Sequence, residues 1–464
     1  MITRLEVDGF KSLRDFAVDL EPMTVFIGPN SAGKSNILEA LGLLSRVASQ
    51  PLDEAFKHGR GRSLDQFTRT GGEPGRTMRF AVEMLLPRTR FKLDKIEDEI
   101  ISSRYRYELV IERWARQSGA EQLVVGNESL STIDRAEDRW IDAHPELADR
   151  ASLSHGHVQL RYSDPPADRA RKWTQTAIAD LPNVRPPGTV GEELSSYRVV
   201  QLDAARLREP SERIDAGTLA PDASNLPTVL ADLPKPLLGE IRADLVSLVP
   251  GISSFEVVPD GDSFRIDFEL SGGERLPARL VSDGTLRILG LLTALKGNPR
   301  PSVIGIEEPE NGIYPGRIRA LLELLQETIA PKDEGELAES PAAAPGAEPD
   351  VPPLPTQLLL TTHSPVVLAA FRSKPQHLRF VDLVRRDGQL VTRARTVGRS
   401  AGPDRGRITI SPREIDRLLQ CDSAPFLSEQ DNPVRCQARD DQRARLAVLP
   451  LLRRLEDAGR RQRP

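Results

Sequence analysis

The octapeptide GPNSAGKS, residues 28–35, matches the pattern G-x-x-x-x-G-K-[ST] at every defined position. It follows an apolar run that predicts a strand at 24–27, and it opens a segment with helical periodicity at 35–48. Glycines allow such a loop to point consecutive backbone N–H groups at phosphate oxygens, and the N-terminus of the helix adds partial positive charge. The flanking strand and helix disfavour a chance match in an ordinary turn, so this stretch predicts a P-loop.

The residues of a P-loop have separate chemical roles. The Lys34 ammonium brings a positive charge to the β- and γ-phosphates, and the Ser35 hydroxyl is a ligand of Mg²⁺. ATP and Mg²⁺ are therefore the predicted cofactors. The nucleotide-binding residues expected from this segment are Gly28, Asn30, Ser31, Gly33, Lys34, Ser35 and Asn36.

Two glutamates follow a second buried strand. The apolar run at 302–306 predicts this strand, which leads directly into Glu307 and Glu308. One carboxylate at a strand end can hold Mg²⁺ through water, and the next can orient and deprotonate the attacking water. We assign these roles to Glu307 and Glu308 in that order. Adjacent glutamates alone are usually a solvated turn, but their position after a buried strand in a P-loop protein favours the catalytic interpretation.

A histidine follows a third predicted core strand. Residues 357–362 form an apolar run, and His363 lies between that run and a helix predicted at 365–371. The carboxyl ends of strands are where α/β sheets bind ligands, and an imidazole there can hydrogen-bond the γ-phosphate. A lone histidine is more often structural, so the catalytic assignment of His363 depends on the two motifs above.

Composition indicates a folded chain with no membrane span. The length of 464 residues allows about two or three domains. No apolar run approaches the ~20 residues of a spanning helix, and the N-terminal residues lack the apolar core of a signal peptide, so we expect a cytoplasmic location. The net charge of −5 argues against general attraction to nucleic acid but leaves room for local basic faces. Cys421 and Cys436 lack metal-ligand spacing and are interpreted as incidental.

The order of predicted strands and helices divides the chain into four parts. Residues 1–90 and 251–410 are predicted to be two halves of one α/β domain, a P-loop NTPase with a mixed sheet and flanking helices. Residues 91–250 predict a less regular α+β insertion. Residues 331–355 are rich in proline, alanine and acid, which predicts a disordered insertion, and residues 411–464 form a short arginine-rich tail.

Five segments resemble, in order, the motifs of the RecF/OLD-like branch of ABC-class ATPases, a group of AAA-family ATPases with AAA_21-type domains. They are ITRLEVDGFKSLRDF at 2–16, GPNSAGKSNILEAL at 28–41, LVSDGTLRILGLL at 280–292, IGIEEPENGIYP at 304–315 and LLLTTHSP at 358–365. The resemblance implies an ABC-type ATPase head that forms a homodimer around two ATP molecules. Each ATP would be held by the P-loop of one protomer and a signature segment of the other. The resemblance also implies that Lys11 contacts the phosphates or the base, and that Gln66 is a candidate Q-loop residue.

The chain also departs from two kinds of relative. Residues 91–240 have neither the length nor the heptads of the coiled coil in SMC-type proteins. Residues 411–464 are too short for the TOPRIM nuclease domain that follows the histidine motif in OLD nucleases, so we expect no nuclease centre in this chain. His155 and His157 have no further metal-ligating residue nearby, and we interpret them as alternation along an exposed strand.

The signature segment has two candidates. LSGGE at 270–274 has a suitable composition, but Pro277 follows it, and its glycines are typical of a tight turn between two strands. Ser282, Asp283 and Gly284 instead precede an apolar helix, whose free N–H groups and dipole favour a phosphate. We therefore assign the contact with the partner's nucleotide to Ser282, Asp283 and Gly284.

Four functions fit these motifs. The first is a Mg²⁺-dependent ATPase, converting ATP to ADP and phosphate, that acts as a dimeric switch in DNA repair or genome maintenance and responds to DNA. The second is an ATPase sensor that controls a separately encoded nuclease or toxin effector in anti-phage defence. The third is the nucleotide-binding subunit of a transporter, which the Lys11 hairpin and the EEPEN motif fit poorly. The fourth is an ATP-binding scaffold without turnover. The sequence does not separate the first two.

Overall fold

The computed structural model describes most of the chain. The described residues are 1–87, 90–93, 96–99, 102–116, 118–148, 151, 153, 159–161, 174–182, 186–214, 217–329, 354–398, 409–411, 415 and 427–428. The insertion expected at 331–355 and the tail expected at 411–464 lie largely outside these residues, and His155, His157, Cys421 and Cys436 lie wholly outside them.

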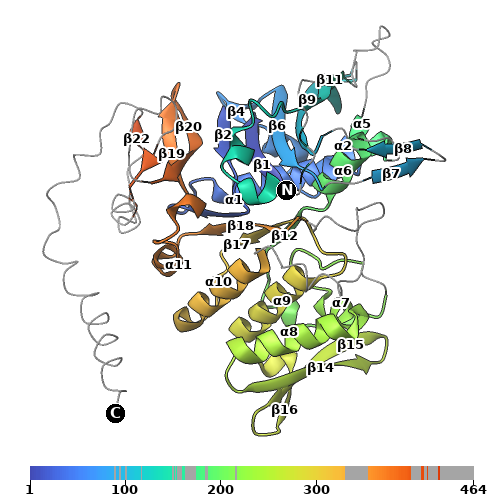
Figure 1. Ribbon diagram of the computed structural model, residues 1–464, viewed down its shortest axis with the longest axis vertical. Helices are drawn as coiled ribbons and strands as arrows, with labels where there is room; N and C mark the ends of the chain where they lie inside the picture. The colour runs from blue at the N-terminus through green and yellow to red at the C-terminus, as the bar shows by residue number, and fades with distance from the viewer. Residues whose placement is uncertain are drawn as a thin grey trace, which may run out of the picture.

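A mixed sheet of eight strands lies at the centre of the molecule (Figure 1). Its order is β12-β17-β18-β3-β19-β20-β21, and β22 also pairs with β19. The strands from β12 to β19 in this order are parallel, whereas β20 is antiparallel to β19. The strands are β3 (Met23–Ile27), β12 (Arg198–Val200), β17 (Val303–Glu307), β18 (Gln357–Thr362), β19 (Leu378–Arg386), β20 (Gln389–Val397), β21 (Thr409–Ile410) and β22 (Leu427–Ser428).

The central strands are buried on both faces. On β3, Val25 and Ile27 belong to one apolar core and Phe26 belongs to a second, and Leu358 and Leu359 on β18 divide in the same way. Alternate side chains of a strand point to opposite faces, so the two cores cover the two sides of the sheet. The core of Phe26 includes helices α1 (Lys34–Val47), α2 (Leu52–Lys57), α5 (Ala177–Asp180) and α6 (Pro187–Ser195). The core of Val25 includes α7 (Leu226–Asp232), α8 (Lys235–Leu248), α9 (Asp283–Lys296), α10 (Pro315–Ile329) and α11 (Pro365–Ala370).

A second, antiparallel sheet packs against the face of the central sheet that carries Phe26. Its order is β11-β10-β9-β6-β1-β2. The sheet crosses the boundary expected between residues 90 and 91, because β6 pairs with β9. Its strands are β1 (Ile2–Asp8), β2 (Phe16–Asp19), β6 (Thr77–Leu85), β9 (Arg104–Ala115), β10 (Glu121–Thr132) and β11 (Gln159–Arg161).

A third sheet lies with α7 and α8 at the end of the molecule away from the second sheet (Figure 1). Its strands are β13 (Ser211–Glu212), β14 (Ile252–Asp260), β15 (Ser263–Leu270) and β16 (Arg275–Pro277). Shorter elements are β4 (Arg69–Thr70), β5 (Glu73–Pro74), β7 (Arg90–Leu93), β8 (Ile96–Glu99), α3 (Arg139–Asp142) and α4 (Pro145–Ala148). Turns of 3₁₀ helix, labelled η, are η1 (Ser63–Gln66), η2 (Arg206–Arg208), η3 (Ala278–Leu280) and η5 (Pro375–His377).

The structure confirms the fold class expected from the sequence. The strands predicted at 24–27, 302–306 and 357–362 are β3, β17 and β18, and the helices predicted at 35–48 and 365–371 are α1 and α11. The three strands are adjacent and parallel, so their carboxyl ends bring the three motifs to one edge of the sheet. None of the described helices has the length and hydropathy needed to cross a membrane.

Candidate functional site

The loop between β3 and α1 has a backbone that few residue types tolerate. Ser31 and Gly33 have positive φ angles of 62° and 94°. A Cβ atom added to Gly28 would lie 2.0 Å from the carbonyl oxygen of Val381, and one added to Gly33 would lie 2.0 Å from Oγ1 of Thr392. Strands β19 and β20 therefore pack closely against the loop, and only glycine fits at positions 28 and 33. No side chain among the described residues caps the start of α1, which leaves its N–H groups available to an anionic ligand.

The P-loop lysine is folded back over the loop. The Lys34 side chain is 6% exposed, and its ammonium donates to the carbonyl oxygens of Gly28 and Pro29, each at 2.9 Å. Burial lowers the pKa of Lys34, and three nearby carboxylates partly oppose that shift. They belong to Glu308, Glu310 and Glu307. The fold therefore brings the lysine and the acidic motif into one electrostatic environment.

Glu307 ends β17 with one carboxylate oxygen paired and one unpaired. Its Oε2 accepts a hydrogen bond from the Arg60 guanidinium at 3.1 Å. Its Oε1 is buried and has no hydrogen-bond partner among the described residues. A buried oxygen without a partner is unfavourable unless an ion or water satisfies it. This oxygen and the Ser35 hydroxyl at the start of α1 are the hard oxygen ligands that Mg²⁺ prefers, so the residues present fit that ion.

Glu308 is held in place by two side chains. Its backbone has a φ of 47°, and its N–H donates to the carbonyl of Thr361 at 2.9 Å. The Asn311 amide donates to Oε2 at 2.7 Å, and Nδ1 of His363 lies 3.0 Å from Oε1. Burial alone would raise the pKa of Glu308, but the hydrogen bonds from Asn311 and His363 hold it below its usual value. The carboxylate is therefore ionised at neutral pH, which is the state a general base requires.

Glu310 is a third carboxylate, which the sequence interpretation missed. Its side chain is 8% exposed, and its Oε1 accepts a hydrogen bond from the Thr362 hydroxyl and lies 4.0 Å from Nδ1 of His363. Its Oε2 is buried and has no hydrogen-bond partner among the described residues. The third acid of EEPEN was the available signal, but the pattern alone does not tell whether that side chain points inward. His363 thus lies between two carboxylates.

The hairpin that carries Lys11 lies beside the P-loop. Asn36 on α1 donates to Oγ of Ser12 at 2.7 Å, and that Oγ lies 2.6 Å from Oγ1 of Thr392. Oγ1 of Thr392 also contacts a carbonyl of the P-loop at 3.1 Å. The Lys11 ammonium forms an ion pair with Glu39 on α1. The other predicted loop residues, Asn30, Ser31 and Ser35, are at least partly exposed.

Gln66, the candidate Q-loop residue, packs against α2 and the segment that follows it. Its side chain is 1% exposed and donates to the carbonyl of Phe56 at 2.8 Å. Its own carbonyl accepts a hydrogen bond from the backbone N–H of Lys11 at 2.9 Å. Gln66 therefore anchors the Lys11 turn, and its assignment as a Q-loop residue stays a prediction.

The two signature candidates have different local structures, as the sequence predicts. The N–H of Gly273 donates to the carbonyl of Leu270 at 2.8 Å, which closes a turn between β15 and β16. Ser282 is the N-cap of α9, and its Oγ accepts a hydrogen bond from the N–H of Thr285 at 3.3 Å. The structure confirms a helix start at Ser282 and a hairpin turn at 270–274.

The start of α9 packs against the end of the acidic loop. A Cβ atom added to Gly284 would lie 2.6 Å from the carbonyl oxygen of Gly312. Asp283 forms an ion pair with Arg208. Among the described residues, the side chains of Ser282 and Asp283 bond to Thr285 and Arg208 and not to the P-loop of the same chain. These residues are therefore placed near the acidic loop, and their contact with a nucleotide stays a prediction.

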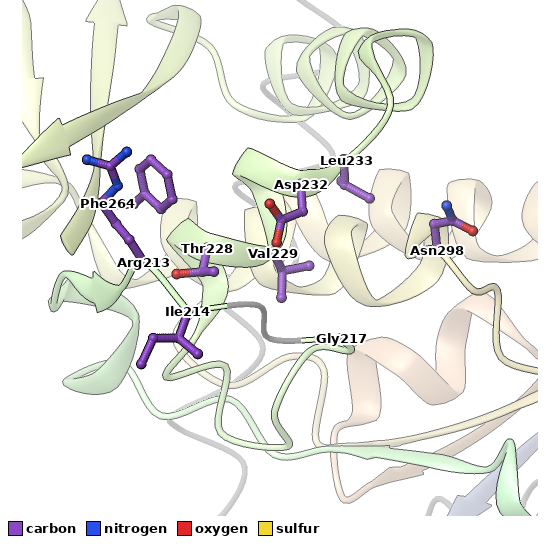
Figure 2. A pocket seen from close by; sticks show the side chains of 9 residues that line it. All are labelled: Arg213, Ile214, Gly217, Thr228, Val229, Asp232, Leu233, Phe264 and Asn298. Atoms are coloured by element: carbon purple, nitrogen blue, oxygen red, sulfur yellow. The ribbon is translucent and has the colours of Figure 1, made fainter. Parts of the chain in front are cut away.

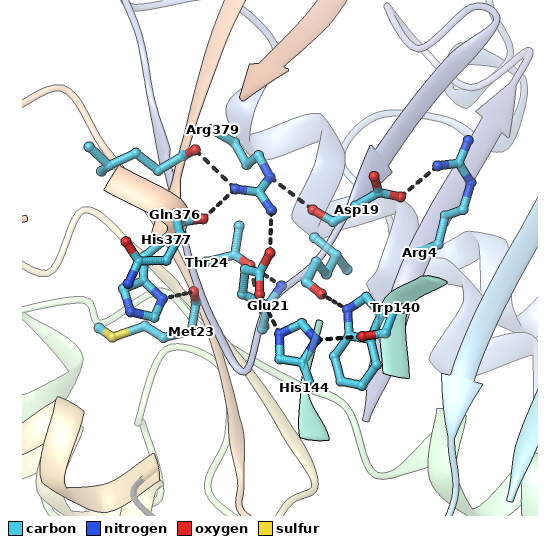
Figure 3. A network of polar contacts seen from close by, with 12 residues as sticks. Arg4, Asp19, Glu21, Met23, Thr24, Trp140, His144, Gln376, His377 and Arg379 are labelled. Carbon is cyan, nitrogen blue, oxygen red and sulfur yellow. Dashed lines mark hydrogen bonds and ion pairs between the residues drawn. The ribbon is translucent and has the colours of Figure 1, made fainter. Parts of the chain in front are cut away.

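Two other polar regions lie outside this site. A cavity of about 490 Å³ lies near β13, α7 and β15 and is lined by residues that include Arg213, Thr228 and Phe264 (Figure 2). In a second region the Glu21 carboxylate accepts from Arg379 at 2.9 Å and contacts Nε2 of His144 at 2.6 Å (Figure 3). Neither region shares a residue with the predicted nucleotide-binding set. No group of three or more metal-ligating side chains occurs in the part of the chain that the structure describes.

The sequence matches one protein family over most of its length. The AAA_21 family, described as "AAA domain, putative AbiEii toxin, Type IV TA system", matches residues 23–369. This range contains the P-loop, both signature candidates, the acidic motif and His363.

Shorter stretches are similar to curated proteins. One is 46% identical over 44 residues to an OLD nuclease of Thermus scotoductus, which is 10% of this chain and 8% of that protein. Another is 35% identical over 78 residues to the DNA replication and repair protein RecF of Vibrio campbellii, which is 14% of this chain and 22% of that protein. The matched stretches thus span less than a quarter of either relative.

Solved SMC heads are also similar to this chain. An SmcHead bound to the C-winged helix domain of ScpA has a TM-score of 0.45 at 16% identity, covering 85% of this chain and 97% of that one. The SMC head domain from Thermotoga maritima has a TM-score of 0.37 at 12% identity, covering 84% and 97%.

Proposed function

The chain belongs to the AAA_21 family and is an ABC-class P-loop ATPase of the RecF and OLD type, and we propose that it hydrolyses ATP with Mg²⁺ at the site around Lys34. One observation carries the proposal. The P-loop lysine shares its electrostatic environment with three carboxylates, and one of these, Glu308, is held ionised by two neighbouring side chains. This is the arrangement that phosphate binding and activation of a water molecule require.

Phosphate binding is assigned to the P-loop and the metal to two oxygen ligands. The N–H groups at the start of α1 and the Lys34 ammonium would hold the β- and γ-phosphates. Lys34 would exchange its carbonyl partners, Gly28 and Pro29, for phosphate oxygens. Ser35 and Glu307 would hold Mg²⁺, and Glu307 would do so through water. The ion supplies positive charge that stabilises the transferring phosphoryl group.

Proton transfer is assigned to Glu308. Its ionised carboxylate would orient the attacking water and accept its proton. His363 contacts the same carboxylate at 3.0 Å, and it would donate a hydrogen bond to the γ-phosphate when the nucleotide is present. To reach the phosphate, His363 would give up its contact with Glu308. Glu310 lies 4.0 Å from the same imidazole nitrogen, so it would keep His363 oriented after that contact is lost.

The test of the proposal is the release of phosphate from ATP by the purified chain in Mg²⁺ and in EDTA. We expect turnover in Mg²⁺ only. Lys34→Ala should weaken ATP binding about tenfold or more, because a charged phosphate contact is lost. Glu274→Gln, which alters an exposed acid in the 270–274 turn, should behave as the wild type. Turnover that persists in the Lys34→Ala protein would contradict the proposed site.

ATP binding is proposed to bring two copies of the chain together. The start of α9, capped by Ser282, offers free N–H groups that would contact the γ-phosphate bound by the partner's P-loop. The family resemblance supports this arrangement. A nucleotide that bridges two protomers stabilises the dimer by mass action.

The proposed biological role is an ATP-gated switch in DNA repair or genome maintenance. The name of the RecF relatives supports this role, and it predicts that DNA stimulates hydrolysis. The description of the AAA_21 family favours a second candidate, an ATPase that controls a separate toxin or nuclease effector. Measuring phosphate release with and without duplex DNA distinguishes them, because only the first role predicts direct stimulation. A transporter role is disfavoured by the Lys11 hairpin and the EEPEN motif.

A further inference from the structure

Four side chains of alternating charge connect the Lys11 hairpin to Glu307, the carboxylate proposed to hold the metal. The Lys11 ammonium pairs with Oε2 of Glu39 on α1. Oε1 of Glu39 lies 3.3 Å from Nε of Arg60, and the other end of that guanidinium lies 3.1 Å from Oε2 of Glu307. Each of these residues comes from a different segment of the chain. The series therefore links the hairpin, α1, the segment after α2 and the end of β17.

Arg60 differs from the two carboxylates it joins. Its side chain is 56% exposed, whereas those of Glu39 and Glu307 are 13% and 15% exposed. An exposed arginine can change its rotamer at little cost in packing, while the carboxylates are fixed by their surroundings. Because Nε and the terminal nitrogen bind different acids, the guanidinium can leave Glu307 and keep its contact with Glu39. The geometry thus allows Arg60 to be a removable counter-charge.

Glu307 needs such a counter-charge when no metal is bound. It adjoins Glu308 in sequence, and the carboxylates of both, with that of Glu310, favour the charged form of Lys34. Neighbouring like charges repel one another in a partly buried site. The Arg60 guanidinium takes the oxygen Oε2, and Oε1 has no hydrogen-bond partner among the described residues. Arg60 therefore stands where a cation is required.

We propose that Arg60 is a positioning residue that neutralises Glu307 in the metal-free protein and releases it when the nucleotide arrives with Mg²⁺. The inference rests on the proposed function, since it assumes that Glu307 serves the metal of bound ATP. Arg60 and the metal compete for one carboxylate. Glu39 keeps Arg60 close to the site, and Lys11 is bound to the same acid, so the release changes the charge balance on the Lys11 hairpin.

The experiment measures the dissociation constant of a fluorescent ATP analogue in Mg²⁺ and in EDTA. In EDTA, the Glu307 carboxylate of a protein without Arg60 repels metal-free ATP, so ATP binds more weakly. In Mg²⁺, the metal no longer competes with Arg60 for that carboxylate. Arg60→Ala should therefore raise the ratio of the EDTA value to the Mg²⁺ value about fivefold, the order expected for a partly exposed ion pair. Arg62→Ala, a matched control two positions away, should leave the ratio at the wild-type value. Arg60→Lys keeps a positive charge, so its ratio should lie between those of the wild type and Arg60→Ala.

A second background removes the carboxylate. In Glu307→Gln the ratio should no longer depend on residue 60, because the charge that Arg60 neutralises is gone. An unchanged ratio in Arg60→Ala, or equal weakening in both buffers, would overturn the inference, since equal weakening marks a phosphate ligand or a structural residue.

A wild type that binds ATP in neither buffer would contradict the proposed function instead. The counter-charge itself is then tested by thermal unfolding in EDTA of wild type, Arg60→Ala, Glu307→Gln and the double variant. A coupling between the two substitutions supports the pair, and strict additivity overturns it.

Discussion

Glu308 combines an unfavourable backbone with favourable side-chain contacts. Its φ of 47° lies in the left-handed region, which costs a non-glycine residue on the order of 1 kcal/mol. The bonds from Asn311 and His363 to its carboxylate, and from its N–H to Thr361, hold it there. The backbone turn directs the carboxylate away from the line of β17, next to His363. Local strain at this residue thus supports the orientation of the proposed base.

His144 should make stability depend on pH. Its two ring nitrogens face the Trp140 carbonyl at 2.7 Å and the Glu21 carboxylate at 2.6 Å, so only the imidazolium can donate to both (Figure 3). Burial lowers the pKa of His144, but these acceptors outweigh it and the net pKa is raised. The stabilisation is complete below the unfolded value of about 6.5 and is lost as pH rises through the raised folded value.

The measurement is the free energy of unfolding at pH 6 and pH 9 for wild type and His144→Gln. We expect the wild type to lose more stability than the variant between these values. The pKa of Glu21 is lowered, so its own contribution changes only in acid, below about 4.5. An identical pH dependence in the two proteins would show that His144 is not protonated in the folded state.

Single residues also mark where prediction from sequence stops. The P-loop pattern identifies Lys34, and the order of strand and acid identifies Glu307 and Glu308. Arg60 and Glu310 could not be predicted, because their roles depend on contacts with side chains distant in sequence. The buried contact of Gln66 with the Phe56 carbonyl could not be predicted either, for the same reason.

The helix α9 is the element on which the signature assignment depends. Ser282 caps it, and the carbonyl oxygen of Gly312 packs closely against Gly284, which leaves no room for a side chain there. Ser282→Arg, which places bulk and charge at the proposed interface, should abolish ATP-driven dimerisation and lower turnover at least tenfold while leaving ATP binding by the monomer nearly unchanged. Ser271→Arg is the matched control in the exposed turn and should cost at most about 0.5 kcal/mol of stability. The reverse order of effects would make the 270–274 turn the signature.

Elements with a local signal were predicted well, and elements without one were not. The Gly-Gly turn and the apolar run after Ser282 distinguish a hairpin from a helix start, and the structure has both. Strand β12 joins the central sheet beside β17 although about a hundred residues separate them in sequence, and only long-range pairing determines that position. The pairing of β6 with β9, which joins the first part of the chain to the expected insertion, has the same origin.

The molecule is layered around its central sheet. The central sheet is covered on both faces by apolar cores, so the edge that carries the three motifs is rigid.

Sedimentation of Glu308→Gln should show a shift from monomer to dimer on addition of Mg²⁺ and ATP, because bound nucleotide is retained. The double variant Lys34→Ala/Glu308→Gln should stay monomeric. One unchanged mass in every condition would contradict an ATP-gated dimer.

The proposed ATP hydrolysis depends on Glu308 acting as the general base. The most direct measurement is phosphate release by wild type and Glu308→Gln, with bound ATP measured in the same samples. The amide keeps the shape of the carboxylate but cannot accept a proton from water. We therefore expect binding near the wild-type level and turnover reduced about a hundredfold or more. Turnover at the wild-type rate, with ATP binding intact, would contradict the assignment of Glu308 as the base.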